Sequence, residues 1–204
     1  MNRNLILYFV KYPEPGKVKT RLAKTIGDEA AAKCYGNLAE HNFRILAPLN
    51  SDGVKNVVVF DPADKEVQIR EWLPTADDYL PQQGNDLGSR LVHAFQFAFD
   101  KKVQAAIAIG SDTIGLRREF ISKAFDSLDH YDVVLGPAKD GGYYLIGLSS
   151  PQQVLFSNIP WSTSEVFNAT LAWIQKEGLS YYLLEQLEDL DEIKMNEDTA
   201  YGTK

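Results

Sequence analysis

The sequence has only one cysteine among 204 residues, so it cannot form an internal disulfide. Cys34 falls on the apolar face of a predicted helix, which favours a buried structural thiol over a nucleophile. No apolar run approaches the ~20 residues of a membrane span. The first apolar run is also too short for a signal-peptide core, and Lys11 follows it. We therefore expect a cytoplasmic protein without a membrane span.

Basic residues are not in excess either. The formal net charge is −7, whereas a general nucleic-acid surface has a basic footprint, so we expect no nucleic-acid partner. The sequence has no Walker A motif, Rossmann dinucleotide fingerprint, nucleophile elbow or zinc-type Cys/His set. Repeats and Gly/Ser linkers are absent as well. Length and composition predict one domain over residues 1–204, whose polar tail from about residue 189 we expect to be flexible.

Short apolar runs alternate with stretches of helical periodicity along the chain. The predicted strands cover residues 5–10, 57–60, 104–109, 132–136, 143–148 and 181–184, with a weak strand or extended loop at 79–83. The predicted helices cover residues 28–46 (with Asp28 as the cap), 65–73 and 117–128, a stretch after an Asp86 N-cap, and a stretch from a capping box at 162–165 to about Gly178. This alternation predicts an α/β fold with three α/β/α layers around a mainly parallel sheet. In such sheets, ligands bind beyond the carboxyl ends of the strands.

A dense group of cations follows the first predicted strand. Lys11, Lys17, Lys19 and Arg21 fall within eleven residues, and Gly16 permits close backbone approach to a ligand. A strand, a glycine turn and a helix start with several cations suit an anionic phosphate chain. The alternative is a solvated basic loop. Because the rest of the chain is acidic, we favour a small anionic ligand.

Three acidic segments are candidates for the remaining chemistry. Asp112 ends a predicted strand and is interpreted as a Mg²⁺ or Mn²⁺ ligand, although it could instead cap the next helix. Asp140 precedes two glycines and two tyrosines, which suits a sugar or base, although the same residues make a hairpin turn readily. Asp189 and Asp191 could complete a metal site or belong to a solvated acidic tail.

Together these segments resemble the GT-A-fold glycosyltransferase-like proteins of unknown function, a group that includes transferases from radical-SAM or selenium-related gene neighbourhoods. More distantly, the sequence is similar to nucleotidyltransferases that act on molybdopterin, sugar phosphates or phospholactate. The matching segments are residues 9–22, 83–91, 110–112, 136–148 and 161–163. Two positions depart from the family pattern: Ile114 replaces a frequent proline, and Glu192 stands where Thr-Pro is expected.

The resemblance implies a metal-dependent transferase that uses a nucleotide-sugar or nucleoside triphosphate donor and a small-molecule acceptor. The alternative is a nucleotide-binding module of the same fold without catalysis. The implied catalytic residues are Lys19, Arg21 and Asp140, and the implied metal ligands are Asp112 and Asp191. The predicted nucleotide-binding residues are Lys11, Gly16, Lys17, Lys19, Thr20, Arg21, Gly84 and Arg90.

Overall fold

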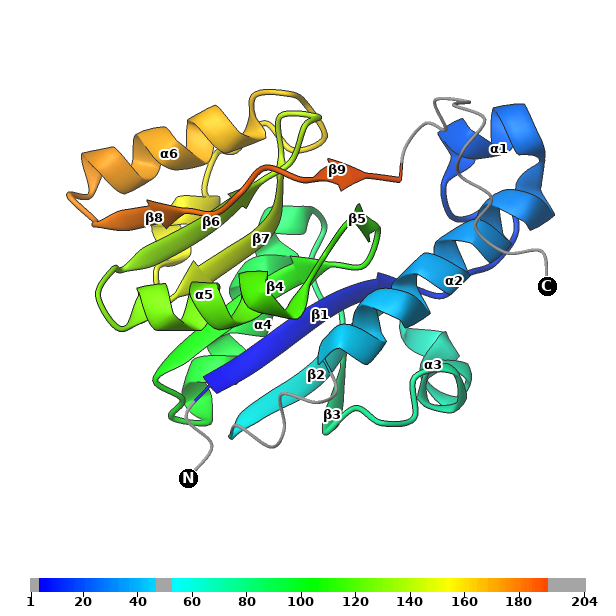
Figure 1. Cartoon of the computed structure of the whole chain (residues 1–204), viewed down its shortest axis with the longest axis horizontal. Helices are drawn as coiled ribbons and strands as arrows, with labels where there is room; N and C mark the ends of the chain where they lie inside the picture. The colour runs from blue at the N-terminus through cyan, green and yellow to red at the C-terminus, as the bar shows by residue number, and fades with distance from the viewer. Residues whose placement is uncertain (1–3, 47–52, 191–204) are drawn as a thin grey trace.

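A seven-stranded mixed sheet forms the centre of the computed structural model, which describes residues 4–46 and 53–190 (Figure 1). Its strands lie in the order β3 (Asp78–Pro81), β2 (Val54–Asp61), β1 (Asn4–Lys11), β4 (Ala105–Gly110), β7 (Tyr143–Leu148), β6 (Val133–Pro137) and β8 (Tyr181–Leu183). Every neighbouring pair is parallel except the two that include β7. The predicted mainly parallel sheet is therefore correct, with one reversed strand.

Strand β1 lies in the interior of the sheet, and both of its faces are covered. Leu5 and Leu7 join the hydrophobic cluster on one face, while Ile6, Tyr8 and Val10 join the cluster on the other. Because successive side chains of a strand point to opposite faces, a strand buried on both sides must be apolar at nearly every position. This requirement is why the run reads as uniformly apolar.

Helices cover both faces of the sheet and complete the three layers (Figure 1). The cluster on one face includes buried side chains of α2 (Asp28–Leu46), α3 (Glu66–Trp72) and α5 (Arg118–Leu128). The opposite cluster includes those of α4 (Leu87–Asp100), α6 (Val166–Lys176) and the 3₁₀ helix η3 (Gln153–Phe156). A second 3₁₀ helix, η2 (Ala63–Lys65), precedes α3. This is the predicted α/β/α arrangement.

Besides the 3₁₀ helices, three short elements were not predicted as elements with their own bounds. Helix α1 (Thr20–Ile26) follows the basic loop, and β5 (Thr113–Ile114) pairs antiparallel with β9 (Glu188–Asp189) in a separate two-stranded sheet. Their lengths of two and seven residues carry too little periodicity to be recognised. The pairing of β5 with β9 depends on a contact between distant parts of the chain.

Two predicted helix caps are wrong. The N-cap residue of α6 is Glu165, whose side chain makes no capping hydrogen bond, while the Thr163 hydroxyl donates to the carbonyl of Pro160 at 2.7 Å and accepts from the Glu165 N–H at 3.3 Å. Asp28 is the first residue of α2, not its cap. The Asp86 cap is correct: its carboxylate accepts from the backbone N–H of Ser89 at 2.7 Å, and the Ser89 hydroxyl accepts from the Asp86 N–H at 3.2 Å.

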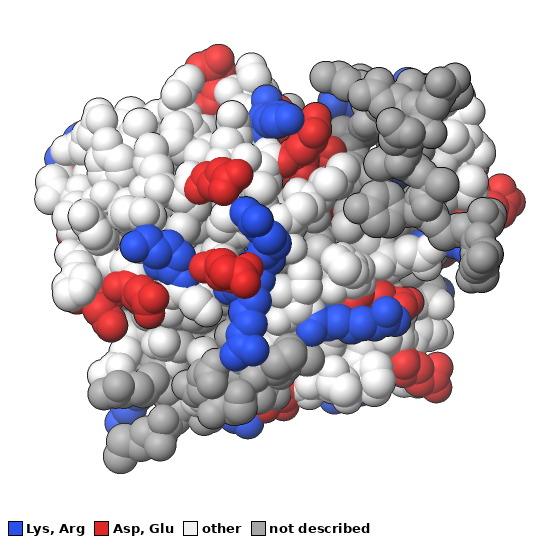
Figure 2. Space-filling model, in the orientation of Figure 1, with Lys and Arg blue, Asp and Glu red and all other residues white. Residues whose placement is uncertain are grey.

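The surface gives two further results. On the face shown in Figure 2, Lys and Arg side chains lie beside Asp and Glu, without one continuous basic area. Within residues 4–46 and 53–190, no helix is long and apolar enough to cross a membrane.

Cys34, expected to be buried, is only partly buried, because it sits at the edge of the packed face of α2. From residue 191 onward, the tail predicted to be flexible lies outside the described residues.

Candidate functional site

The carboxyl ends of four parallel strands meet at one edge of the sheet. Lys11 at the end of β1 lies opposite Asp61 at the end of β2, and Phe9 lies opposite Gly110 at the end of β4. Strand β3 ends beside them, where the Gln82 N–H donates to the carbonyl of Phe60 at 2.8 Å. The segments that follow these ends therefore gather in one place, as the parallel sheet predicts.

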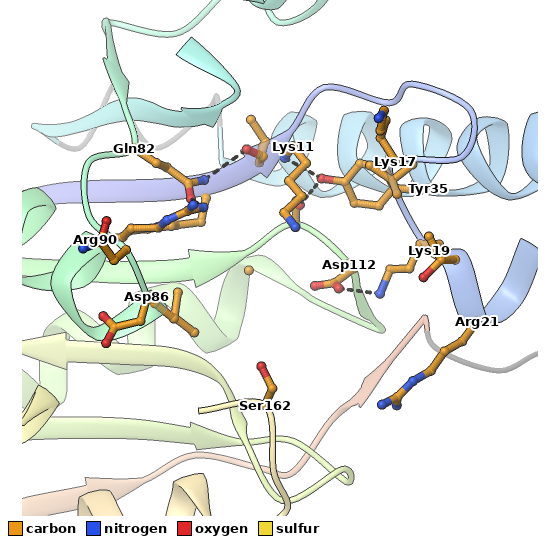
Figure 3. Close-up of a pocket in the computed structure, with 18 residues that line it drawn as sticks. Lys11, Lys17, Lys19, Arg21, Tyr35, Gln82, Asp86, Arg90, Asp112 and Ser162 are labelled. Atoms are coloured by element: carbon orange, nitrogen blue, oxygen red, sulfur yellow. Dashed lines mark hydrogen bonds and ion pairs between the residues drawn. The ribbon is translucent and has the colours of Figure 1, made fainter. Parts of the chain in front are cut away.

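These segments surround a cavity of about 740 Å³ (Figure 3). The cavity is lined by Phe9, Val10, Lys11, Lys17, Val18, Lys19, Thr20, Arg21, Tyr35, Gln82, Asn85, Asp86, Leu87, Arg90, Gly110, Ser111, Asp112 and Ser162. A smaller cavity of about 350 Å³ adjoins it and shares Lys11, Lys17 and Val18 as wall residues. The larger cavity lies where the sequence predicts the site.

Positive charge dominates the lining of the larger cavity. Five lining residues are cations, whereas two are carboxylates, in a chain whose net charge is −7. Among the described residues, the ammonium groups of Lys11 and Lys17 take part in no ion pair. Their charge is available to a ligand, so the cavity suits an anion.

The basic loop owes its shape to two residues with left-handed backbone and to one buried anchor. Gly16 has φ 76° and Lys19 has φ 47°, the second of which is uncommon for a residue with a Cβ. Between them, Val18 is 4% exposed and packs against Ala32, Tyr35 and other residues of α2. The anchor fixes the loop on α2, so that Lys17 and Lys19 face the cavity.

Lys19 pairs with Asp112 across the cavity floor. Its Nζ donates to Asp112 Oδ2 at 2.6 Å, and the two side chains are 9% and 34% exposed, respectively (Figure 3). Unusual backbone angles often occur at functional sites, where the surrounding structure holds them in place. The left-handed backbone of Lys19 therefore indicates that the surrounding structure holds this residue in place for a function.

Tyr35 of α2 lies behind these groups. Its hydroxyl accepts from the Lys11 N–H at 2.9 Å and shares a hydrogen bond of 2.8 Å with Ser111 Oγ. Burial is the main cause that raises the pKa of Tyr35 to about 12. The hydroxyl is thus neutral at physiological pH and retains its proton for hydrogen bonding.

Arg90 is engaged by protein groups. Its guanidinium donates to Gln82 Oε1 at 2.9 Å and to the carbonyl of Gly84 at 3.2 Å, and it lies 3.5 Å from Asp61. Gly84 does not line the cavity, but its carbonyl helps to orient Arg90. Arg90 therefore holds the loop before α4 against the ends of β2 and β3.

Asp140 lies outside the cavity lining, in the turn between β6 and β7. Its Oδ1 accepts from the Gly142 N–H at 2.8 Å, and the Ala138 N–H donates to the carbonyl of Gly142 at 3.0 Å. This geometry is that of the hairpin turn, one of the two interpretations of the segment. The catalytic role of Asp140 stays a prediction.

The acidic residues near the C-terminus reach Asp112 through the small sheet. Asp189 lies opposite Thr113, and the Leu190 N–H donates to the carbonyl of Asp112 at 2.9 Å. The predicted ligand Asp191 falls outside the described residues. Among residues that the structure does describe, no group of three or more His, Cys, Asp and Glu is arranged around a common metal position.

Most of the predicted site residues meet in the cavity. Lys11, Lys17, Lys19, Thr20, Arg21, Arg90 and Asp112 line it. Gly16 lies in the loop itself, and its left-handed φ explains the need for glycine.

The prediction missed Tyr35, Gln82, Ser111 and Ser162. Tyr35 is a buried residue of the packed face of α2, but it also lines the cavity. Ser162 has φ 65°, a property that the sequence does not reveal.

Residues 45–163, more than half of the chain, match the family described as "uncharacterized protein conserved in bacteria (DUF2064)". The chain belongs to this family. No curated protein matches it.

Among solved structures, it is similar to a "putative nucleotide-diphospho-sugar transferase" from Desulfovibrio desulfuricans G20. The identity is 35%, the TM-score is 0.89, and the match covers 98% of this chain and 90% of that one.

Two more distant structures share the fold alone. The inositol-1-phosphate CTP transferase from T. maritima is 13% identical, with a TM-score of 0.53 and coverage of 94% of this chain and 90% of that one. Glucosyl-3-phosphoglycerate synthase from Mycobacterium tuberculosis, solved with Mn²⁺ and UDP, is 10% identical, with a TM-score of 0.51 and coverage of 92% and 71%. The predicted GT-A-like fold and family resemblance are confirmed.

Proposed function

We propose that this DUF2064 protein is a transferase that binds the phosphates of a nucleotide donor in the 740 Å³ cavity. The observation that carries the proposal is the concentration of five cations around a cavity at the strand ends of an acidic protein. Lysine and arginine form short, charge-assisted hydrogen bonds with phosphate oxygens. The volume falls within the range of about 300–1,000 Å³ that is usual for small-molecule sites.

Each cation has a distinct expected role. Lys11 and Lys17, which have no ion pair among the described residues, are expected to contact the phosphates directly. Lys19 is held at Asp112 and is placed to stabilise charge that develops on the leaving group. Because α1 has only seven residues, we assign anion binding to these side chains and not to its helix dipole.

The named relatives support this class of reaction. The Desulfovibrio relative, at 35% identity, is described as a nucleotide-diphospho-sugar transferase. The two distant structures use a nucleoside triphosphate or were solved with a nucleoside diphosphate. We therefore infer the donor class from the cavity and the relatives together.

A divalent cation is compatible with the cavity residues. Asp112 presents a carboxylate to the cavity, and Mg²⁺ or Mn²⁺ typically uses one or two carboxylates together with substrate phosphates and water. Such an ion would compete with Lys19 for Asp112, so Lys19 would turn toward a phosphate. When bound, the ion would supply neutralisation of phosphate charge.

Two reactions fit these groups. In nucleotidyl transfer, an acceptor oxygen forms a bond to the α-phosphorus of a nucleoside triphosphate while the bond to pyrophosphate breaks. In glycosyl transfer, the acceptor bonds to the anomeric carbon while a nucleoside diphosphate leaves and the acceptor proton passes to solvent or a base. Both leave a polyphosphate in contact with the cationic wall, so the leaving group is common to them.

Calorimetric titration tests the proposal. We would titrate the protein with UDP, CDP, GDP and ADP, with matching triphosphates and nucleotide-sugars, each with and without Mg²⁺ or Mn²⁺. Lys17→Ala should bind about ten- to hundredfold more weakly, since one charge-assisted contact contributes roughly 1.5–3 kcal/mol. Lys24→Ala, which makes the same charge change outside the cavity lining, is the matched control.

The product then distinguishes the reaction types. Radiolabelled donors incubated with pooled sugars, sugar phosphates and polyols should release either pyrophosphate or a nucleoside diphosphate. Binding without turnover would favour the nucleotide-binding module. Failure of every nucleotide to bind, or equal binding by Lys17→Ala, would contradict the site.

A further inference from the structure

Strands β1 and β4 separate at the point where the candidate site begins. Their parallel pairing ends with Phe9 opposite Gly110. Beyond this pair, β1 continues through Lys11 into the basic loop, whereas β4 turns at Ser111 and Asp112. No further rung of the sheet therefore fixes Lys11 relative to Asp112.

A side chain of α2 bridges this gap. The hydroxyl of Tyr35 accepts from the Lys11 N–H at 2.9 Å and pairs with Ser111 Oγ at 2.8 Å (Figure 3). Tyr35 and Ser111 are each 4% exposed and the hydrogen bond between them is buried, whereas the contact with the Lys11 N–H is partly buried. One buried hydroxyl thus joins the ends of two strands through two hydrogen bonds.

A second residue of α2 holds the other side of the Asp112 turn. Asn42 Nδ2 donates to the carbonyls of Ser111 and Thr113 at 3.2 and 2.8 Å, and Asn42 is 1% exposed. The carbonyls of the two residues that flank Asp112 are thereby held by the helix. Tyr35 and Asn42 lie seven residues apart, which places them on one face of α2.

The same tyrosine also contacts the basic loop. Its side chain belongs to the small cluster in which Val18 is buried, together with Ala32 and Ala39. Val18 lies between Lys17 and Lys19, which both line the cavity. Tyr35 therefore touches the loop, the end of β1 and the turn after β4.

We propose that Tyr35 is a positioning residue, whose hydroxyl holds Lys11 at a fixed separation from the Lys19–Asp112 pair, so that Lys11 and Lys19 act on one phosphate ligand. The inference rests on the proposed function, since it needs a phosphate at this cavity. Tyr35 lines the cavity, but both hydrogen bonds of its hydroxyl are made with protein groups, the Lys11 N–H and Ser111 Oγ. Loss of its hydroxyl should loosen the position of Lys11 without removing any of the cationic side chains.

The test compares Tyr35→Phe with Tyr8→Phe. The Tyr8 hydroxyl donates to the carbonyl of Ala39 on the same helix at 2.8 Å, and Tyr8 is fully buried, but it does not line the cavity. Both variants thus lose one tyrosine hydroxyl that links α2 to the sheet: Tyr8→Phe loses one hydrogen bond and Tyr35→Phe loses two. Inorganic pyrophosphate, with and without Mg²⁺, serves as the probe in calorimetric titration, alongside the nucleoside diphosphates.

We expect Tyr35→Phe to bind pyrophosphate about tenfold more weakly than the wild type, whereas Tyr8→Phe should stay within about twofold. Amide hydrogen exchange at Lys11 and Asp112 should accelerate in Tyr35→Phe only. Ser111→Ala, which removes one partner of the hydroxyl, is the second variant if Tyr35→Phe does not fold. It should weaken binding in the same direction.

The outcomes separate this inference from the proposed function. Wild-type binding with equal affinities in Tyr35→Phe and Tyr8→Phe would overturn the positioning role alone. Equal losses in both variants would reduce Tyr35 to a structural residue and would also overturn it. Absence of binding of pyrophosphate and of all nucleotides to the wild type would overturn the proposed function and the inference together.

Discussion

Lys19 Nζ and Asp112 Oδ2 lie 2.6 Å apart, although the two residues are separated by 93 positions in the sequence. The lysine is nearly buried and has a left-handed backbone, whereas the carboxylate is a third exposed and faces the cavity. The pair neutralises one of the two carboxylates in a mainly cationic lining. A ligand that binds at the cavity therefore meets an anion-attracting wall without net repulsion from Asp112.

Replacing the lysine tests its role in ligand binding. Lys19→Ala should lower nucleotide affinity about ten- to hundredfold, because one charge-assisted contact contributes roughly 1.5–3 kcal/mol. Calorimetric titration would measure this loss. Lys24→Ala, an equal change of charge on α1 outside the cavity lining, should leave affinity unchanged. An unchanged affinity in folded Lys19→Ala would remove this lysine from the site.

Asp112→Asn tests the metal ligand. The ion pair is partly exposed, so the free energy of unfolding should fall by about 1 kcal/mol or less. The increase in nucleotide affinity upon addition of Mg²⁺ should disappear, since an amide is a poor ligand for a hard cation. Asp86→Asn is the control, because it makes the same charge change in the same lining and Asn also caps helices well. Equal wild-type affinity with and without Mg²⁺ would contradict the metal.

Asp140→Ala distinguishes a role in the turn from a role in catalysis. Loss of the hydrogen bond to the Gly142 N–H should lower the free energy of unfolding by about 1 kcal/mol. From its place outside the lining, we expect affinities for a nucleoside diphosphate and for a nucleotide-sugar to stay the same. Parallel titrations would measure both. A selective loss for the nucleotide-sugar would restore the predicted role at the transferred group.

Asp132 gives a pH dependence of stability. Hydrogen bonds from the Ser180 hydroxyl and N–H, at 2.7 and 2.8 Å, lower the pKa of Asp132 below its usual 3.8. The ionised form is therefore favoured in the folded state, and its contribution is present above about pH 4 and lost as pH falls through the lowered pKa. Thermal unfolding of Asp132→Asn should show a destabilisation at pH 7 that narrows below pH 4.

The control for this experiment lies three residues earlier. Asp129 is exposed, and within the described residues its side chain makes neither a hydrogen bond nor an ion pair. Asp129→Asn should therefore unfold like the wild type at both pH values. If Asp132→Asn lowers the thermal midpoint equally at both pH values, packing and not ionisation of Asp132 fixes the start of β8.

The sequence predicts the sheet well because burial on both faces leaves a local signal. β1, β2 and β4 are apolar along most of their lengths, and the short runs that result are visible without a structure. The small β5–β9 sheet has no such signal, since Thr113 and Asp189 pair only after the chain has folded.

The same difference separates the site residues that were predicted from those that were not. Lys17 and Lys19 belong to a local cluster of charge, which composition reveals. Tyr35 reads as an ordinary buried residue of α2, and its second function depends on where two distant strands end. A left-handed φ at Lys19 or Ser162 depends on packing and cannot be inferred from residue type.

The β5–β9 sheet can form only late in synthesis, because its second strand lies near the C-terminal end of the described residues. Leu190, directly after β9, packs on the cluster that anchors Val18, and its N–H holds the carbonyl of Asp112. A ribosome makes the basic loop long before it makes this strand, and domains fold as units while the chain emerges. The cations are therefore made early, but Asp112 and the Val18 cluster gain their contacts with Leu190 only when residues 188–190 have left the exit tunnel. A nascent chain that is stalled before that point should carry the basic loop without these contacts.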